Sequence, residues 1–347
     1  MSEQRAIVIL GAGSWGTALA IQFARSGTAT TLWGRIEDHL DRLIEDRENQ
    51  HYLPGAGFPD SLAIEPDLKR ALASAPMVLV AVPSHAFRAT LETIRPMLQV
   101  DARLAWATKG FEVETGKLPH QVAEEVLGSG IATAVVSGPT FAKEVGAGLP
   151  TAMTVASADA DFAAELAESI SGENFRAYTS DDMVGVEVGG AVKNALAIGA
   201  GICDGLGFGA NTRVALITRG LVEMTRLGVA LGAKPATFMG LAGMGDLVLT
   251  CTDDLSRNRR MGLALAAGKT VDEAAIEIGQ VVEGVKAADA VHRVASAAGV
   301  EMPICEQIYR ILYHGEDPRA AVSALMQREL KSEFAPGGQT REPAKPI

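Results

Sequence analysis

A single lysine in an apolar stretch is the first residue in this chain that could do chemistry. Lys193 lies in GGAVKNALAIGAG, where every other residue except Asn194 is Gly, Ala, Val, Leu or Ile. Burial would disfavour its charged form and lower its pKa from about 10.4 toward neutrality. A lysine in that state can exchange a proton with an alcohol/ketone pair. The stretch therefore predicts a catalytic acid–base, against the simpler alternative that Lys193 reaches the surface or pairs with a carboxylate.

The helical neighbours of Lys193 are mostly small. On a helix over 181–202, the positions three, four and seven residues away hold Gly189, Gly190, Leu196, Ala197 and Ala200. Glycine in a helix costs about 0.5–1 kcal/mol relative to alanine, so these residues are expected to serve a purpose. They would let a ligand or a packed backbone approach the helix closely.

A second group of chemically capable residues occupies LAGMGDLVLTCTDDLSRNRR, residues 241–260. The glycines before Asp246 predict a flexible turn, and its carboxylate is placed to pair with a lysine or to cap that turn. The run SRNRR, Ser256 to Arg260, opens a predicted helix with three arginines, a hydroxyl and an amide. Backbone N–H groups, a hydroxyl and arginine side chains suit a phosphate monoester. The alternative is a solvated basic face.

Two short motifs each follow a predicted strand. ATKG (107–110) places Lys109 directly after the first, and SGPTFAKE (137–144) follows the next. Open α/β sheets bind ligands at the carboxyl ends of their strands. Both motifs are therefore expected at one ligand-binding edge.

The sequence GAGSWG follows the first predicted strand and opens a helix, which is the context that a dinucleotide-binding turn requires. Gly11 permits the tight turn, Gly13 lets the backbone approach a pyrophosphate, and Gly16 allows close packing of helix and strand. The helix N-terminus attracts negative charge. Arg35 stands near the end of the second strand and could pair with a 2′-phosphate, which favours NADP, whereas the acidic Glu37 and Asp38 keep NAD open.

The elements that would position these residues change character along the chain. Apolar runs at 6–10, 29–33, 77–82, 104–107 and 132–136 alternate with helical segments, as in a parallel sheet covered on both faces. Helical spacing dominates afterwards, over 181–202, 214–231, 259–267, 271–278, 285–298 and 305–312. The prediction is a Rossmann-type α/β domain over 1–180, an all-α substrate-binding and catalytic domain over 181–331, and a disordered tail over 332–347.

Composition narrows the class of function. The 347 residues carry a formal charge of −11, which disfavours nucleic acid or an anionic membrane as a partner. The chain has no secretory start and no long charge-free apolar run, so we expect a cytoplasmic protein with no membrane span. Three dispersed cysteines and the absence of a His/Cys motif predict no metal site.

Taken together, the motifs resemble those of bacterial NAD(P)-dependent glycerol-3-phosphate dehydrogenases, from about Ile7 to Leu330. The resemblance rests on GAGSWGTALA, VPSH, WATKG, SGPTFAKE, GGAVKNALAIGAG, GFGAN, GLAGMGDLVLTC, SRNRR and GQVVEG. It implies hydride transfer between NADPH or NADH and C2 of dihydroxyacetone phosphate, giving sn-glycerol 3-phosphate for phospholipid synthesis. It also implies a homodimer.

The resemblance assigns roles to residues one by one. The proton-transfer lysine falls on Lys193, assisted by Lys109 and Asp246. The implied substrate contacts are Lys109, Gly138, Thr140, Lys193, Asp246, Ser256, Arg257 and Asn258. The implied cofactor contacts, beside the glycines Gly11, Gly13 and Gly16, are Ser14, Trp15, Arg35, Lys109, Ala142, Arg257, Val281 and Glu283. The alternatives are a related reductase of hydroxyacids or ketoacids and a non-catalytic NAD(P)-sensing regulator.

Overall fold

The computed structural model describes residues 5–279, 281–329 and 332–333. It divides into two compact units. The first comprises the chain up to Ala191 together with Ala233–Leu249, and the second comprises Val192–Gly232 and the chain from Thr250 on. The division falls inside two helices, Met183–Gly205 and Asp246–Thr252. Almost all of the predicted tail over 332–347 lies outside the described residues.

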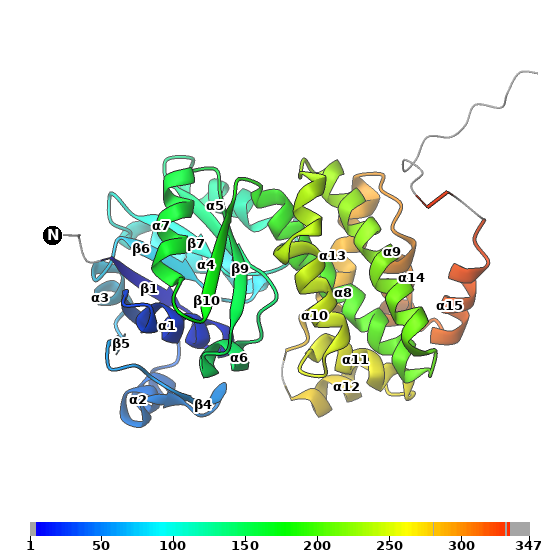
Figure 1. Ribbon diagram of the computed structural model, residues 1–347, viewed down its shortest axis with the longest axis horizontal. Helices are drawn as coiled ribbons and strands as arrows, with labels where there is room; N and C mark the ends of the chain where they lie inside the picture. The colour runs from blue at the N-terminus through cyan, green and yellow to red at the C-terminus, as the bar shows by residue number, and fades with distance from the viewer. Residues whose placement is uncertain (1–4, 280, 330–331, 334–347) are drawn as a thin grey trace, which may run out of the picture. The chain divides into compact units, whose positions relative to one another are not determined.

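The first unit is built on an eight-stranded sheet in the order β10-β9-β8-β7-β6-β1-β2-β5 (Figure 1). Its neighbouring strands are parallel except β8 and β9, which are antiparallel. The mostly parallel sheet confirms the predicted Rossmann-type architecture. In chain order its strands are β1 (Ala6–Leu10), β2 (Ala29–Trp33), β5 (Leu62–Ile64), β6 (Met77–Val80), β7 (Arg103–Trp106), β8 (Thr133–Ser137), β9 (Thr151–Ser157) and β10 (Phe175–Ser180).

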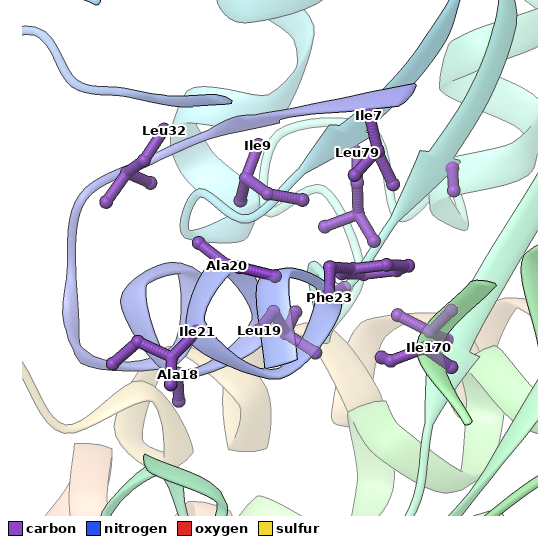
Figure 2. Close-up of a cluster of buried hydrophobic side chains, with 14 of the residues drawn as sticks. Ile7, Ile9, Ala18, Leu19, Ala20, Ile21, Phe23, Leu32, Leu79 and Ile170 are labelled. Atoms are coloured by element: carbon purple, nitrogen blue, oxygen red, sulfur yellow. The ribbon is translucent and has the colours of Figure 1, made fainter. Parts of the chain in front are cut away.

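Alternating side chains of β1 enter two apolar clusters, so both faces of the sheet are covered. Ile7 and Ile9 belong to one cluster, and Val8 and Leu10 belong to the other. Figure 2 shows Ile7 and Ile9 beside α1, the helix that contributes Phe23 to the same cluster. Burial of each such side chain is worth roughly 1.5–3 kcal/mol. The paired clusters therefore hold the strand ends in fixed places.

The helices of this unit are α1 (Ser14–Arg25), α2 (Glu37–Asp46), α3 (Leu68–Ala73), α4 (Ser84–Ile94), α5 (Pro119–Leu127), α6 (Ala142–Ala147) and α7 (Ala160–Ile170), with a small hairpin of β3 (Glu48–Asn49) and β4 (Leu53–Gly57).

The rest of the described chain is helical, as the spacing predicted. Its helices are α8 (Met183–Gly205), α9 (Gly209–Ala230), α10 (Asp246–Thr252), α11 (Arg257–Ala266), α12 (Val271–Ile278), α13 (Glu283–Ala297), α14 (Pro303–His314) and α15 (Pro318–Met326). By length and composition alone α8 could cross a membrane, but its apolar window is wholly buried, as in the core helix of a globular protein.

One local prediction was wrong. The glycines before Asp246 do not form a flexible turn, because Leu241–Gly245 is a turn of π-helix that continues into α10. Close packing accounts for the glycines. A side chain at Gly243 would lie 2.3 Å from the carbonyl oxygen of Phe238, and one at Gly189 would lie 2.4 Å from that of Ala242. The small residues of α8 thus serve backbone packing here.

Candidate active site

The GAGSWG turn connects β1 to α1 as the sequence predicted. Gly11 has a φ of 126°, and a side chain on it would lie 2.5 Å from the carbonyl oxygen of Ala81. A Cβ at Gly16 would lie 1.9 Å from the carbonyl oxygen of Gly11. Gly13 differs, because nothing lies within 4 Å of a Cβ placed there. Backbone therefore packs closely against Gly11 and Gly16, whereas the space beside Gly13 is empty.

The open glycine is where a dinucleotide fits. Gly13 is the N-cap of α1 and provides no side-chain cap, so the N–H groups of the first helical turn are not covered by a capping side chain. Such groups and the helix dipole favour a pyrophosphate. The indole Nε1 of Trp15 is buried with no hydrogen-bond partner in the described part of the chain. The residues present fit a nicotinamide dinucleotide.

Asn49 supports this turn and has no counterpart in the sequence-based prediction. Its side chain is fully buried and donates hydrogen bonds to the carbonyl oxygen of Ala12 at 3.1 Å and to Oγ1 of Thr17 at 2.8 Å. The backbone N–H of Tyr52 in turn donates to Asn49 Oδ1 at 3.1 Å. Asn49 thus fixes the middle of the turn from a separate hairpin. No local sequence pattern predicts this role, because an isolated asparagine in a polar segment is equally typical of an ordinary loop.

Two substitutions in the turn are expected to act differently. Gly16→Ala should lower the thermal midpoint of unfolding, because its methyl group would collide with backbone that cannot move aside. Gly13→Ala should leave that midpoint within about 2 °C and raise the Kd of NADPH roughly 10-fold, because it fills the space that a pyrophosphate would approach. Thermal unfolding and fluorescence titration measure the two effects. Equal loss of stability in both variants would contradict this account of the open glycine.

Lys109 and Asp246 form an ion pair at the edge of the sheet. Lys109 Nζ lies 2.8 Å from Asp246 Oδ2, with side-chain exposures of 15% and 2%. Lys109 follows β7 by three residues, and Asp246 is the first residue of α10. The prediction that Asp246 pairs with a lysine is thus satisfied by Lys109. A buried pair of this kind holds a fixed positive charge where a developing oxyanion can use it.

The SGPTFAKE segment lies close to Lys109. A Cβ at Gly190 of α8 would lie 3.4 Å from Lys109 Cγ and 3.5 Å from Ser137 Oγ, which ends β8. Gly138 follows, and Thr140 donates from Oγ1 to its carbonyl oxygen at 3.2 Å. Ala142 opens α6. The two motifs therefore reach one edge of the sheet, as expected.

Lys193 is buried rather than extended to the surface. It is 7% exposed, and its Nζ donates to Thr250 Oγ1 at 3.1 Å. Along the chain, Thr250 is four residues after Asp246 on α10, and Lys193 is three residues after Gly190 on α8. Residues at these spacings share a helix face. Thr250 is a second residue that sequence reasoning missed.

Asn258 is locked in a chain of amide hydrogen bonds. Its Nδ2 donates to Asn194 Oδ1 at 2.9 Å, and its Oδ1 accepts from the backbone N–H of Gly284 at 2.9 Å. This fixes the start of α11 against α8 and α13. Glu283 begins α13, and the half-exposed Val281 lies just before it.

The SRNRR run is not a uniform basic cluster. Ser256 caps α11 by accepting from the backbone N–H of Arg259. Arg259 is 9% exposed and pairs with Asp204 at 2.7 Å and with Asp254. The expectation of three arginines for one phosphate is therefore wrong for Arg259, whose charge is used inside the protein. Arg257 is half-buried and Arg260 is exposed, and Arg35 in the first unit is also exposed.

The dinucleotide turn of the first unit and the buried lysine of the second are features expected of a nicotinamide-dependent oxidoreductase. The family model described as NAD-dependent glycerol-3-phosphate dehydrogenase N-terminus matches residues 6–163, and the corresponding C-terminus model matches 182–323. A glycerol-3-phosphate dehydrogenase [NAD(P)+] of Aeromonas salmonicida is 57% identical over 96% of this chain and 100% of that protein. This chain belongs to the NAD-dependent glycerol-3-phosphate dehydrogenase family.

Solved structures agree with this assignment. The glycerol-3-phosphate dehydrogenase of Coxiella burnetii superposes with a TM-score of 0.90 at 47% identity, covering 94% of this chain and 99% of that one. A ketopantoate reductase family protein of Ralstonia eutropha has a TM-score of 0.56 at 17% identity over 92% of this chain and 99% of its own. That second likeness concerns the fold alone.

Proposed function

We propose that the enzyme transfers hydride reversibly between NAD(P)H and C2 of dihydroxyacetone phosphate, giving sn-glycerol 3-phosphate, with Lys193 as the proton donor and acceptor. The observation that carries this role is the burial of Lys193, with its Nζ held by Thr250 Oγ1. A buried, oriented ammonium group can give its proton to a carbonyl oxygen as the carbon is reduced. The nicotinamide, when bound, supplies or accepts the hydride.

We assign an assisting role to Lys109 and Asp246. The Asp246 carboxylate holds the ammonium group of Lys109 in place, and the fixed positive charge can polarise the substrate carbonyl. Because the pair is already formed in the protein, little reorganisation is needed during the reaction. Gly138 and Thr140 supply backbone and hydroxyl contacts beside it.

Binding of the phosphate group is assigned to the start of α11. Arg257 at its first position carries a guanidinium group, the side chain of Asn258 is held by hydrogen bonds, and Ser256 is the N-cap of the helix. A clamp on the phosphate fixes which carbon faces the nicotinamide. The proposed cofactor contacts are those predicted from the sequence: Gly11, Gly13, Ser14, Trp15, Gly16, Arg35, Lys109, Ala142, Arg257, Val281 and Glu283.

Steady-state kinetics test the proposal. The protein is mixed with NADPH or NADH and with dihydroxyacetone phosphate or a panel of 2-ketoacids, and absorbance is followed at about 340 nm, where reduced nicotinamide absorbs. We expect turnover with the phosphorylated ketone and kcat/KM at least 100-fold lower with ketoacids, because an arginine fork placed for phosphate discriminates by charge and geometry. Preference for a ketoacid would establish the related reductase instead, and no turnover with any ketone would favour the regulator.

The proposal also covers the location, the oligomeric state and the domain roles of the enzyme. We place the enzyme in the cytoplasm as a homodimer that supplies glycerol phosphate for phospholipid synthesis. We also assign nucleotide binding to residues 1–180 and substrate binding to 181–331. Paired kcat/KM values for NADPH and NADH will establish the cofactor preference, for which Arg35 favours NADPH.

A further inference from the structure

A buried glutamate on α8 is not used by the mechanism above. Glu187 is 4% exposed, and its carboxylate accepts hydrogen bonds from three donors. The indole N–H of Trp106 donates to Oε1 at 3.0 Å, and the backbone N–H of His120 donates to the same oxygen at 2.9 Å. The His120 ring Nδ1 contacts Oε2. A buried carboxylate costs several kcal/mol in lost hydration, and a complete set of hydrogen-bond donors is required to offset that cost.

One of the three donors, the indole of Trp106, comes from a strand that leads into the candidate active site. Trp106 is the last residue of β7 and lies three residues before Lys109. Its ring is fully buried and packs edge-on against Phe87 of α4. His120 lies in the first turn of α5. The carboxylate of Glu187 therefore ties α8 to the end of β7 and to the start of α5.

The spacing along α8 connects this tie to the proposed catalytic groups. Gly190 is three residues after Glu187, on the same face, and is the residue that packs against the Lys109 side chain. Lys193 is six residues after Glu187, about 9 Å along the helix axis. A slip of α8 against β7 would therefore displace Lys109 relative to Gly190.

The geometry points to Glu187 as a positioning residue: its carboxylate, held by Trp106 and His120, sets the register of α8 against the end of β7 and thereby the placement of Lys109 beside Gly190. Catalysis of this kind is sensitive to displacements of about 1 Å, which can reduce the rate 100-fold. A positional error of that size is expected to affect kcat more than binding of the dinucleotide, because the pyrophosphate contacts are assigned to the GAGSWG turn on β1 and α1 and Lys109 is only one of the proposed cofactor contacts.

The protonation of the network agrees with this role. Burial alone would lower the pKa of His120, but the hydrogen bond and the charge of Glu187 outweigh it, and the pKa is raised. Burial also raises the pKa of Glu187, so the two groups titrate as a pair. Glu124 is the other charged group that acts on the ring.

Glu223 offers a matched control. It is also 4% exposed, lies on the long helix α9, and accepts from the backbone N–H groups of Ile304 and Cys305 at 2.8 and 3.1 Å. It therefore caps α14, and within the described residues its carboxylate hydrogen-bonds to no segment to which we assign catalysis. Burial raises its pKa to about 7, so it resembles Glu187 in environment as well as in residue type.

The experiment compares Glu187→Gln with Glu223→Gln in the full-length enzyme. We expect Glu187→Gln to lower kcat 10-fold or more with the KM for NADPH within twofold, and Glu223→Gln to lower the thermal midpoint without changing kcat beyond twofold. Wild-type kcat in Glu187→Gln would overturn the inference, and so would an equal loss of kcat in both variants.

A second pair of variants serves if Glu187→Gln does not fold. His120→Asn keeps an N–H donor near the position of Nδ1, whereas His120→Leu removes that donor. The His120 side chain is partly exposed, so both substitutions should be tolerated by the fold. We expect the asparagine variant to retain kcat within threefold and the leucine variant to lose it 10-fold. Equal activity in the two would overturn the inference. The inference rests on the proposed role of Lys109. A wild-type enzyme that turned over no ketone would overturn the proposed function, whereas the comparison of variants tests only the positioning by Glu187.

Discussion

Lys193→Met is expected to lower kcat at least 10³-fold while leaving the Kd of NADPH within twofold of the wild-type value. Loss of a positioned acid–base alone removes a factor of about 10²–10⁴. Methionine has a similar length and favours helices, so it should occupy the buried site without disturbing α8. The N–H···O contact to Thr250 is lost, but a hydroxyl can satisfy itself locally. Stopped-flow reduction of dihydroxyacetone phosphate and fluorescence titration of NADPH measure the two quantities.

Lys286→Met is the matched control for this variant. Lys286 lies on α13, another helix, and is exposed to solvent. The same chemical change there should leave kcat within twofold, because no proposed contact is removed. If Lys193→Met retained activity within a few-fold, proton transfer would have to be assigned to another group, and Lys109 would be the first to test.

The sequence predicted those parts of the site that local patterns encode. The five predicted strands coincide with β1, β2, β6, β7 and β8 to within two residues, because each has an apolar run followed by Gly, Pro or polar residues. The turn at Gly11 and the lysines after β7 and within α8 followed from the same reasoning. In each case the residues next to it in the chain were enough to predict the feature, although Asp246 and Thr250, the partners of Lys109 and Lys193, lie far along the chain.

The parts that were missed depend on contacts between distant segments. β10 lies at the edge of the sheet and has only one fully buried residue in six, so it shows no apolar run. Asn49 and Glu187 each support the site through residues more than 30 positions away. Arg259 was interpreted as part of a phosphate site although Asp254, five residues earlier, is one of its two acidic partners; the other, Asp204, lies 55 residues earlier in the chain. A pattern within a short window does not carry the contacts between distant segments.

The phosphate-binding role leads to the second large expected effect. Arg257→Ala should raise the KM for dihydroxyacetone phosphate roughly 10- to 100-fold with a smaller change in kcat, the equivalent of about 1.4–3 kcal/mol for a lost charge-assisted hydrogen-bonding group. The residue is at the first position of α11, so truncation to alanine leaves the Ser256 cap and the helix intact. Steady-state kinetics at constant ionic strength separate the two parameters.

Arg260→Ala distinguishes a specific clamp from a general effect of charge. It removes the same charge from the same helix three residues later, where the side chain is exposed. If the arginines formed only a diffuse basic surface, both substitutions would raise KM slightly and by similar amounts. The increase would be smaller at high salt, because salt screens such charges. A specific contact with phosphate requires that Arg257→Ala alone gives the large effect and that the effect persists in salt. An unchanged KM in Arg257→Ala would rule out the clamp and return the run SRNRR to the interpretation of a solvated basic face.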